Sequence, residues 1–388
     1  MIKTFFRLFG LILIFCSFSL GQTWYSPHRV TYTSTPSRLP EIAVDSANTI
    51  HIVWMDNSPG NYEIYYKKCT SGGAGTWSLV KRLTWTDTNS EYPFVAVSSD
   101  DTVHVVWCEF VDYTQWDLYY KSSSDGGATW GGTTRLTWSS GNSMYPVLVP
   151  VGCGDLRVFF EDDKSGNSEI YFVSRSCGSW GGLNRLTWTS GDSRNLYAAL
   201  DNSSDLHLIW SEMIDSDYEL CHRKSTDYGL IWSGRTRVTY SSSHSQDPSF
   251  DFDPVDNTMR LAWSEGGCGD RRVCFKNRNP STNAFYGYKR LTYVTGECCF
   301  PTVAASTSNY IHIVYEGDSP GNYELYHKKS SNGGVNWTAP FRLSWTSGSS
   351  RSPKMVASGA LVGLRLVYND YTPGNAEIYF KRADLIIK

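Results

Sequence analysis

The hexapeptide Arg82-Leu83-Thr84-Trp85-Thr86-Asp87 is one copy of a motif that recurs along the whole chain, and we call this motif the anchor. Its counterparts are RVTYTS from Arg29, RLTWSS from Arg135, RLTWTS from Arg185, RVTYSS from Arg237, RLTYVT from Arg290 and RLSWTS from Arg342. Neighbouring copies begin roughly 50 residues apart, a period that predicts a repeat architecture with one supersecondary unit per repeat.

Every repeat follows the same order between two anchors. A polar linker, usually ending in proline, leads to a short apolar run, then to a run such as IHIVW, and then to a run such as EIYYKK. Apolar and polar residues alternate with period two, so these runs are strands. Four strands per repeat predict an all-β, seven-bladed β-propeller of four-stranded antiparallel blades. The first anchor precedes all other elements, and we therefore expect a strand at 29–34 to join the C-terminal blade and close the ring.

The N-terminus carries Lys3 and Arg7 and then a short apolar run that ends near Gly21. This pattern predicts a cleaved signal peptide over 1–21, followed by a single propeller domain over 22–388 and no transmembrane span. We expect the protein to be secreted or periplasmic, and monomeric. A net charge of -3 gives no indication of a nucleic-acid partner. No cofactor is expected, because no nucleotide-binding loop, zinc motif or serine-nucleophile elbow is visible.

The turn between the third strand and the anchor carries a recognisable box. Its residues are Ser123, Asp125, Gly127 and Trp130, with copies at Ser225, Asp227, Gly229 and Trp232 and at Asn332, Gly334 and Trp337. Short polar side chains hold such turns, glycine takes positive φ, and tryptophan packs inward, which favours a structural role. The box resembles that of the Asp-box (BNR repeat) sialidase-like β-propeller family. The resemblance implies that the boxes lie on the face opposite an active site.

That resemblance does not carry catalytic residues over. Sialidases of the family have six blades, whereas this sequence counts seven repeats, so its catalytic residues remain unknown. A sialidase also needs an arginine cluster for a carboxylate and a tyrosine activated by a glutamate.

Repeated charges have a simple structural interpretation. The anchor arginines face an acid in the third strand of most blades, such as Arg82 and Glu63, and we expect intra-blade ion pairs. Acids also follow the second strand, at Asp56, Glu109, Glu161, Glu212, Glu265, Glu316 and Asp370. They either cap turns or form an acidic ring on one face.

Candidate binding residues lie where the repeat breaks its symmetry, at the ends of the linkers. Arginine stands at this position in three blades, as Arg38, Arg194 and Arg351, and converging arginines could bind a carboxylate. Glu91, Tyr92 and Tyr145 stand at the same mouth of the channel. Trp116, in the second blade, either stacks on a sugar or packs its own turn.

Cysteines form a further break in the repeat. Export permits disulfides. Cys153 and Cys177 share one blade and are predicted to pair. Local disulfides are also predicted among Cys268, Cys274, Cys298 and Cys299, in preference to a metal site, because histidines at ligand spacing are absent.

The sequence predicts an exported propeller that binds a glycan or an extracellular protein through its linker face, without catalysis. One alternative is an exo-sialidase-type glycoside hydrolase. Another is a structural module of the cell envelope.

Overall fold

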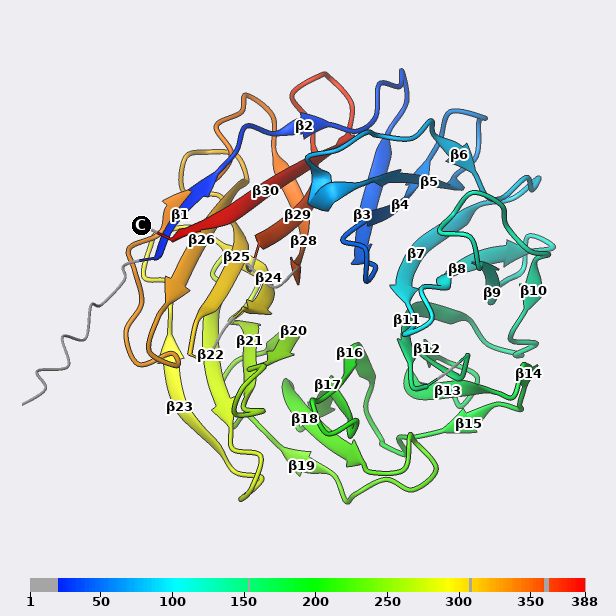
Figure 1. The fold of residues 1–388 in the computed structure, drawn as a ribbon. Helices are drawn as coiled ribbons and strands as arrows, with labels where there is room; N and C mark the ends of the chain where they lie inside the picture. Colours follow the sequence, from blue (N-terminus) through cyan, green and yellow to red (C-terminus); the bar gives the residue numbers. More distant parts are fainter. Residues whose placement is uncertain (1–19, 153, 307–308, 359–362, 388) are drawn as a thin grey trace, which may run out of the picture.

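The computed structural model describes residues 20–152, 154–306, 309–358 and 363–387, which form a ring of seven β-sheets around a central channel (Figure 1). Each sheet is an antiparallel blade whose first strand is innermost and whose anchor strand is outermost. The predicted all-β, seven-bladed propeller is confirmed. Within the described ranges, no helix has the length and apolar character needed to cross a membrane.

The first four blades follow one another around the ring. Blade one holds β3 (Ser37–Val44), β4 (Ile50–Asp56), β5 (Glu63–Cys69) and β6 (Lys81–Arg82), with a 3-10 turn, η1, at Ser71–Gly73. Blade two holds β7 (Ser90–Val97), β8 (Val103–Val111), β9 (Gln115–Ser123) and β10 (Thr134–Arg135). Blade three holds β11 (Ser143–Pro150), β12 (Leu156–Asp162), β13 (Glu169–Ser176), β14 (Ser179–Trp180) and β15 (Asn184–Arg185). Blade four holds β16 (Ser193–Leu200), β17 (Leu206–Ile214), β18 (Asp217–Ser225) and β19 (Thr236–Arg237).

The last three blades complete the ring. Blade five holds β20 (Ser245–Phe252), β21 (Met259–Glu265), β22 (Arg272–Arg278) and β23 (Phe285–Arg290). Blade six holds β24 (Cys298–Ala305), β25 (Ile311–Gly317), β26 (Glu324–Ser330) and β27 (Phe341–Arg342). Blade seven holds β28 (Ser350–Ser358), β29 (Gly363–Asp370) and β30 (Glu377–Ile387), together with the N-terminal strands β1 (Leu20–Trp24) and β2 (His28–Arg29).

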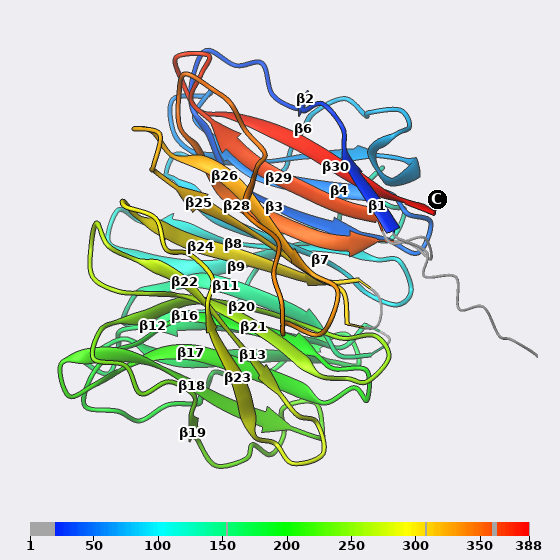
Figure 2. The ribbon, with the colours of Figure 1, turned by 90° about the vertical axis from the view of Figure 1, so that its left-hand side faces the viewer.

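The N-terminal segment closes the ring on β30, as predicted. The closing strand is shorter than the expected 29–34, because only β2 pairs in register, with Arg29 opposite Tyr379. Beyond it the chain turns away to the linker, although Val30 N–H still donates to the carbonyl of Ile378. β1 adds a pairing that the sequence did not predict and lies beside β30 in both views (Figure 1, Figure 2). Residues 1–19 of the predicted signal peptide lie outside the described residues.

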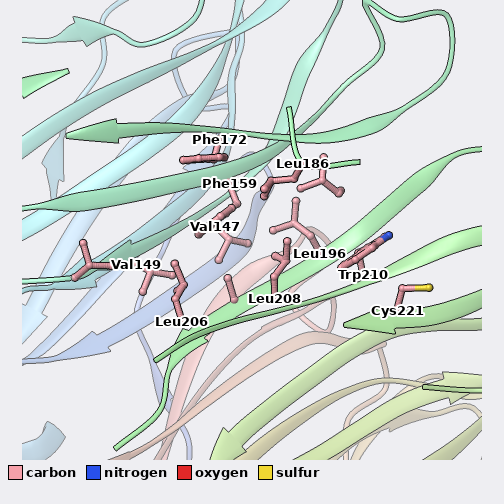
Figure 3. Packing of buried hydrophobic residues seen from close by; sticks show 13 residues of the cluster. Val147, Val149, Phe159, Phe172, Leu186, Leu196, Leu206, Leu208, Trp210 and Cys221 are labelled. Atoms are coloured by element: carbon pink, nitrogen blue, oxygen red, sulfur yellow. The ribbon is translucent and has the colours of Figure 1, made fainter. Parts of the chain in front are cut away.

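Hydrophobic clusters fill the junctions between blades. Each of the seven clusters joins residues of two consecutive blades, and the last joins blade seven to blade one. Figure 3 shows the junction of blades three and four, where Val147 and Phe159 meet Leu196 and Leu208. Because a blade is covered on both faces, all seven residues of β4 are buried. This two-sided burial explains the nearly continuous apolar runs of the second strands.

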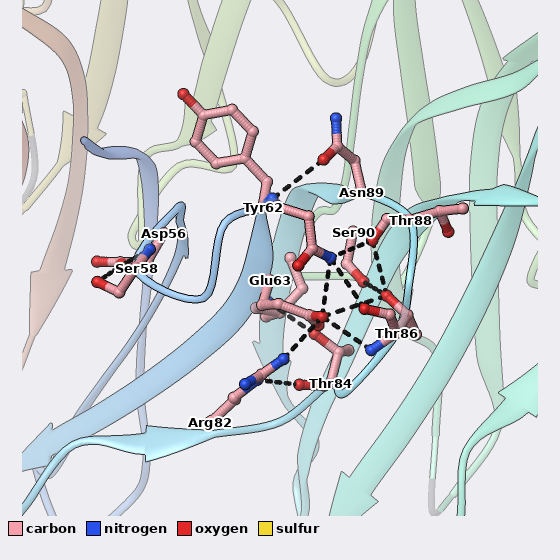
Figure 4. Close-up of polar contacts among 12 residues, drawn as sticks. Asp56, Ser58, Tyr62, Glu63, Arg82, Thr84, Thr86, Thr88, Asn89 and Ser90 are labelled. Atoms are coloured by element: carbon pink, nitrogen blue, oxygen red, sulfur yellow. Dashed lines mark hydrogen bonds and ion pairs between the residues drawn. The ribbon is translucent and has the colours of Figure 1, made fainter. Parts of the chain in front are cut away.

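The anchor ties the outermost strand to its own blade through a buried carboxylate. Glu63 accepts hydrogen bonds from Arg82 Nη2 at 2.9 Å, from Thr86 N–H at 2.8 Å and from Asn61 Nδ2 at 3.0 Å (Figure 4). The predicted ion pair recurs as Arg29–Glu377, Arg135–Asp117, Arg185–Glu169, Arg237–Glu219 and Arg342–Glu324. Blade five differs, because Arg272 occupies the position of the acid.

The box hairpins also connect neighbouring blades. Ser123 Oγ accepts the Gly127 N–H at 2.8 Å and donates to Asp125 Oδ1 at 2.7 Å. Trp130 of blade two then packs edge-on against Tyr66 of blade one, with ring centroids 5.0 Å apart. The same contact joins Trp232 to Phe159 and Trp337 to Phe275. Each box therefore holds both its own turn and the blade before it.

Candidate functional site

A β-bulge interrupts the innermost strand of every blade at the same position. In blade one the register shifts between Arg38 and Glu41, and Leu39 takes a positive φ of 49°. The equivalent residues all have positive φ, from 49° to 55°, and we call them the bulge ring: Leu39, Tyr92, Tyr145, Asn195, Asp247, Phe300 and Ser352. Proline follows in six blades, where its missing N–H suits a bulge. A non-glycine residue at positive φ is strained, and such strain gathers at functional positions.

The bulge ring surrounds a large cavity. The cavity has a volume of about 1000 Å³, and all seven bulge-ring residues line it. We call this end of the channel the channel mouth. Deeper in the channel, Glu41 and Lys354 form an ion pair at 2.5 Å, and burial raises the pKa of Glu41. The mouth is thus a concave, preformed site with convergent polar groups, the usual form of a small-ligand site.

The three predicted arginines do not converge. Arg38 and Arg351, in adjacent blades one and seven, both line the cavity, whereas Arg194 is absent from its lining. Arg194 pairs with Asp192 at 2.9 Å in blade four, and half of its side chain is exposed. Blades one and four are too far apart around the ring for one carboxylate to reach both. The shared three-arginine site is therefore not formed.

Arg38 and Arg351 differ in what they contact. Arg351 pairs with Glu316 at 3.0 Å and lies over the ring of Tyr323, 4.0 Å from its centroid. Arg38 lies 5.8 Å from the ring centroid of Tyr371, and its Nε has no hydrogen-bond partner among the described residues. No ion pair involves Arg38 in the described ranges, whereas Arg351 and Lys354, the other cations of the lining, are both paired. Arg38 is thus the cation available to a ligand.

A charged network borders the mouth across blades five to seven. Arg271 pairs with Glu297 at 2.5 Å and with Asp247 of the bulge ring at 3.3 Å. Tyr323 Oη donates to the other oxygen of Glu297 at 2.5 Å. Each acid on this side has a donor, so the network fixes the positions of Asp247 and Arg351.

Tyrosines form the opposite side of the mouth. The predicted pair Tyr92 and Tyr145 both line the cavity, with ring centroids 4.7 Å apart and planes at 70°. Tyr145 is 45% exposed and Phe300, another bulge residue, is 39% exposed, so aromatic surface faces the cavity. Glu91 stands behind them, outside the lining, and accepts a hydrogen bond from Asn89. Burial raises the pKa of Glu91.

Glu161 and Glu316 were assigned to the wrong register in the sequence. Strand pairing shows that Asp56 corresponds to Asp162 and to Gly317, so both glutamates lie one residue earlier and face the other way. Each accepts the N–H of the next blade's bulge residue: Glu161 from Asn195 at 2.7 Å, and Glu316 from Ser352 at 2.6 Å. Burial raises the pKa of Glu161 to about 7. Asp56 itself caps its turn through Ser58 N–H.

Other predicted residues lie away from the mouth. Trp116 packs against Phe110, with ring centroids 5.0 Å apart, and joins the cluster between blades two and three. It therefore packs its own hairpin.

The cysteines that the structure describes are free thiols, so the predicted disulfides among Cys268, Cys274, Cys298 and Cys299 are not present. Cys298 and Cys299 are successive residues of β24 and point to opposite faces of the blade. Cys274 is buried in β22 near Tyr288, while Cys268 lies in an exposed turn. Cys153 lies outside the described residues, so its pairing with Cys177 stays a prediction. No group of His, Cys, Asp and Glu in the described part could hold a metal ion.

Five of the seven bulge-ring residues were missed in the sequence, where only Tyr92 and Tyr145 were predicted at the channel mouth. The signal for the bulge ring was present, because the residue before each linker proline is Leu39, Tyr92, Tyr145, Asp247, Phe300 or Ser352. We had selected the position two residues before the proline, which holds Arg38, Arg194 and Arg351. The bulge residue one position later is the one that lines the cavity in all seven blades.

No protein-family model matches this chain, and no curated protein matches it in sequence. Among solved structures it is similar to a polysaccharide lyase, an ulvan lyase bound to -[GlcA(1-4)Rha3S]-, with TM-score 0.68, 8% identity and coverage of 91% of this chain and 95% of that one. It is also similar to a Hadza microbial sialidase, with TM-score 0.56, 13% identity and coverage of 92% and 68%. A protein of unknown function from Dyadobacter fermentans has TM-score 0.61, 12% identity and coverage of 94% and 100%. At these identities the likenesses establish the propeller fold alone.

Proposed function

We propose that this protein binds an acidic glycan at the channel mouth, as a binding propeller without catalysis. The observation that carries the proposal is the bulge ring, which places aromatic and polar side chains around a cavity that also contains the unpaired Arg38. The carbohydrate ligands and substrates named for the lyase and the sialidases of similar fold are consistent with a saccharide ligand.

The lining suits a sugar with an anionic group. Tyr92, Tyr145 and Phe300 offer faces on which a pyranose ring stacks, while Asn195 and Ser352 offer hydrogen bonds to hydroxyls. Lys354 and Arg351 are each neutralised by a glutamate, which leaves the charge of Arg38 for a carboxylate or sulfate of the glycan. The strained bulges hold these groups in place before the ligand arrives, which lowers the entropic cost of binding.

An exo-sialidase is the alternative, and one observation favours it. Tyr323 donates to Glu297 beside Arg351, which is the kind of tyrosine–carboxylate pair that an activated nucleophile needs. Two features count against it: Arg194 is outside the cavity, and neither Tyr323 nor Glu297 lines it. Release of a fluorophore from a sialoside tests this alternative, and turnover abolished by Tyr323→Phe would establish it.

A glycan array of neutral, uronate-containing, sulfated and sialylated oligosaccharides tests the binding proposal. We expect acidic glycans to bind, and Arg38→Ala to weaken binding about tenfold or more, because a charge-assisted hydrogen bond is lost. Lys329→Ala, which removes a cation outside the cavity lining, is the matched control and should bind like the wild type. Absence of binding to every class on the array, or equal binding by Arg38→Ala, would contradict the proposal.

A further inference from the structure

The fourth residue of every anchor is an aromatic side chain that faces solvent. These residues, which we call the rim aromatics, are 67–76% exposed: Tyr32, Trp85, Trp138, Trp188, Tyr240, Tyr293 and Trp345. The anchor leucine and threonine just before them are buried, as Leu83 and Thr84 illustrate. The outer strands that precede these residues, such as β6 and β19, lie on the circumference of the ring, away from the channel mouth (Figure 1).

Each rim aromatic is held by the arginine of its own anchor. The guanidinium carbon lies 4.2 Å from the ring centroid of Trp345, 5.5 Å from that of Trp138 and 5.8 Å from that of Trp85. The same contact is made by Arg29, Arg185, Arg237 and Arg290 in their blades. About two thirds or more of each side chain remains exposed, so much of each ring is open to solvent.

Packing does not account for this pattern. The carboxylate beneath the anchor, such as that of Glu63, is fully buried and is already paired with its arginine. Burial of a quarter to a third of an aromatic side chain contributes little to stability. The box hairpin has decayed in several repeats, yet this exposed position is Trp or Tyr in all seven. Single exposed apolar residues are ordinary, but seven in one repeat position form an ordered surface.

We propose that the rim aromatics are a second, polyvalent site that binds a polysaccharide of repeated pyranose units. This surface differs from the channel mouth and does not depend on the function proposed for it. An indole or phenol ring stacks on the C–H face of one sugar. In six blades an acid neutralises the anchor arginine, so the platforms of these six blades bind an uncharged sugar face.

The arrangement fits a repeating polymer better than a protein or a membrane. Successive platforms lie on successive blades, and polar residues such as Thr86 and Thr346 follow the aromatic residue in several anchors. Bilayers bind a contiguous apolar face, and the core of a protein interface is more apolar than its rim, whereas these rings are placed singly on separate blades. A polymer of repeated sugar units can instead contact several rim aromatics at once, and these weak, equivalent contacts add up to a high overall affinity.

Native electrophoresis in gels that each contain xylan, mixed-linkage β-glucan, pectin or alginate tests the proposal. We expect retardation by at least one polymer. We expect the quadruple variant Trp85→Ala, Trp138→Ala, Trp188→Ala and Trp345→Ala to weaken binding at least about tenfold, and Trp85→Ala alone to weaken it only about two- to threefold. Single-ring sugars should fail to compete.

The matched control replaces four exposed apolar residues outside this position with alanine: Leu79, Leu230, Ile231 and Val335, which are 62–88% exposed. This variant should be retarded like the wild type, and both it and the quadruple variant should keep the wild-type urea midpoint. Retardation of the quadruple variant equal to that of the wild type would overturn the proposal. So would the absence of retardation by all four polymers, or tryptophan-dependent binding to phosphatidylcholine vesicles without binding to any polysaccharide.

Discussion

Arg351 Nε lies 3.0 Å from Oε2 of Glu316, and this contact joins blade seven to blade six at the channel mouth. The same carboxylate accepts the N–H of the bulge residue Ser352 at 2.6 Å. One buried acid therefore supports both a strained backbone and a cation. Arg351 therefore stabilises the structure, whereas Arg38, which has no ion pair among the described residues, is available to bind a ligand.

Removal of Arg351 should therefore destabilise the protein. In Arg351→Ala the Glu316 carboxylate remains buried without its cation, and we expect a loss of about 1–3 kcal/mol in the free energy of unfolding. Urea denaturation measures this loss. The double variant Arg351→Ala with Glu316→Gln should recover part of it, and Arg38→Ala should lose less than Arg351→Ala. Equal losses from both arginines would contradict this assignment.

In five blades, a lysine of the third strand clamps the blade to the one before it. Lys328 Nζ donates to the carbonyl of Leu291 at 2.7 Å, and Lys67, Lys121, Lys276 and Lys381 make the same contact at other junctions. Lys328→Met should cost about 1 kcal/mol in urea denaturation, because the carbonyl loses its donor. Lys329→Met, on the next residue, is the matched control and should leave the free energy of unfolding unchanged. Equal losses in the two variants would rule out the clamp.

Buried histidines make the fold sensitive to acid. Burial lowers the pKa of His104 to about 4 and that of His312 to about 3. In the unfolded chain these histidines bind protons near pH 6.5, whereas in the folded protein they stay neutral. The free energy of unfolding is therefore largest above pH 6.5 and falls as the pH drops towards 4. We expect the urea midpoint to fall steadily between pH 6.5 and 4. His104→Gln should flatten this dependence, while His244→Gln, on a partly exposed residue beside Asp217, should not. An unchanged slope in His104→Gln would refute the explanation.

Glu161 should make the stability of the fold change with pH in the opposite direction, since it favours the folded state at low pH. Burial raises its pKa to about 7, so the folded protein holds a proton that the unfolded chain releases near pH 4.5. Its contribution is present below pH 4.5 and is lost as the pH rises through 7. Glu161→Gln should thus gain stability relative to the wild type between pH 5 and 8, by up to about 3 kcal/mol. Asp112→Asn, on an exposed residue, is the control, and a constant difference across this range would contradict the assignment.

The fold could be predicted from the sequence because its period is long and regular. Seven anchors, each followed by three runs of alternating residues, fix the number of blades, and the first anchor alone before the repeats implies closure at the termini. The site could be predicted only in part. Tyr92, Tyr145, Arg38 and Arg351 do line the mouth, but Arg194 does not.

The remaining features depend on geometry that the sequence pattern does not carry. A bulge shifts the register after Arg38, and it adds the bulge residue Leu39 to the cavity lining beside Arg38. Glu161 and Glu316 were misassigned for a different reason: each directly follows the aromatic end of the second-strand run, whereas Asp56 lies two residues after Trp54. Cys298 and Cys299 share a short segment, yet strand pleating directs them to opposite faces.

Calorimetric titration of one acidic oligosaccharide and its carboxyl-reduced, uncharged analogue tests the central claim most directly. The ligand is the tightest acidic binder from the array, and both forms are titrated into the wild type and Arg38→Ala. If Arg38 binds the anionic group at the channel mouth, carboxyl reduction weakens binding to the wild type about tenfold or more and leaves binding to Arg38→Ala unchanged. An equal loss in both proteins would show that the anionic group binds elsewhere and would contradict the claim.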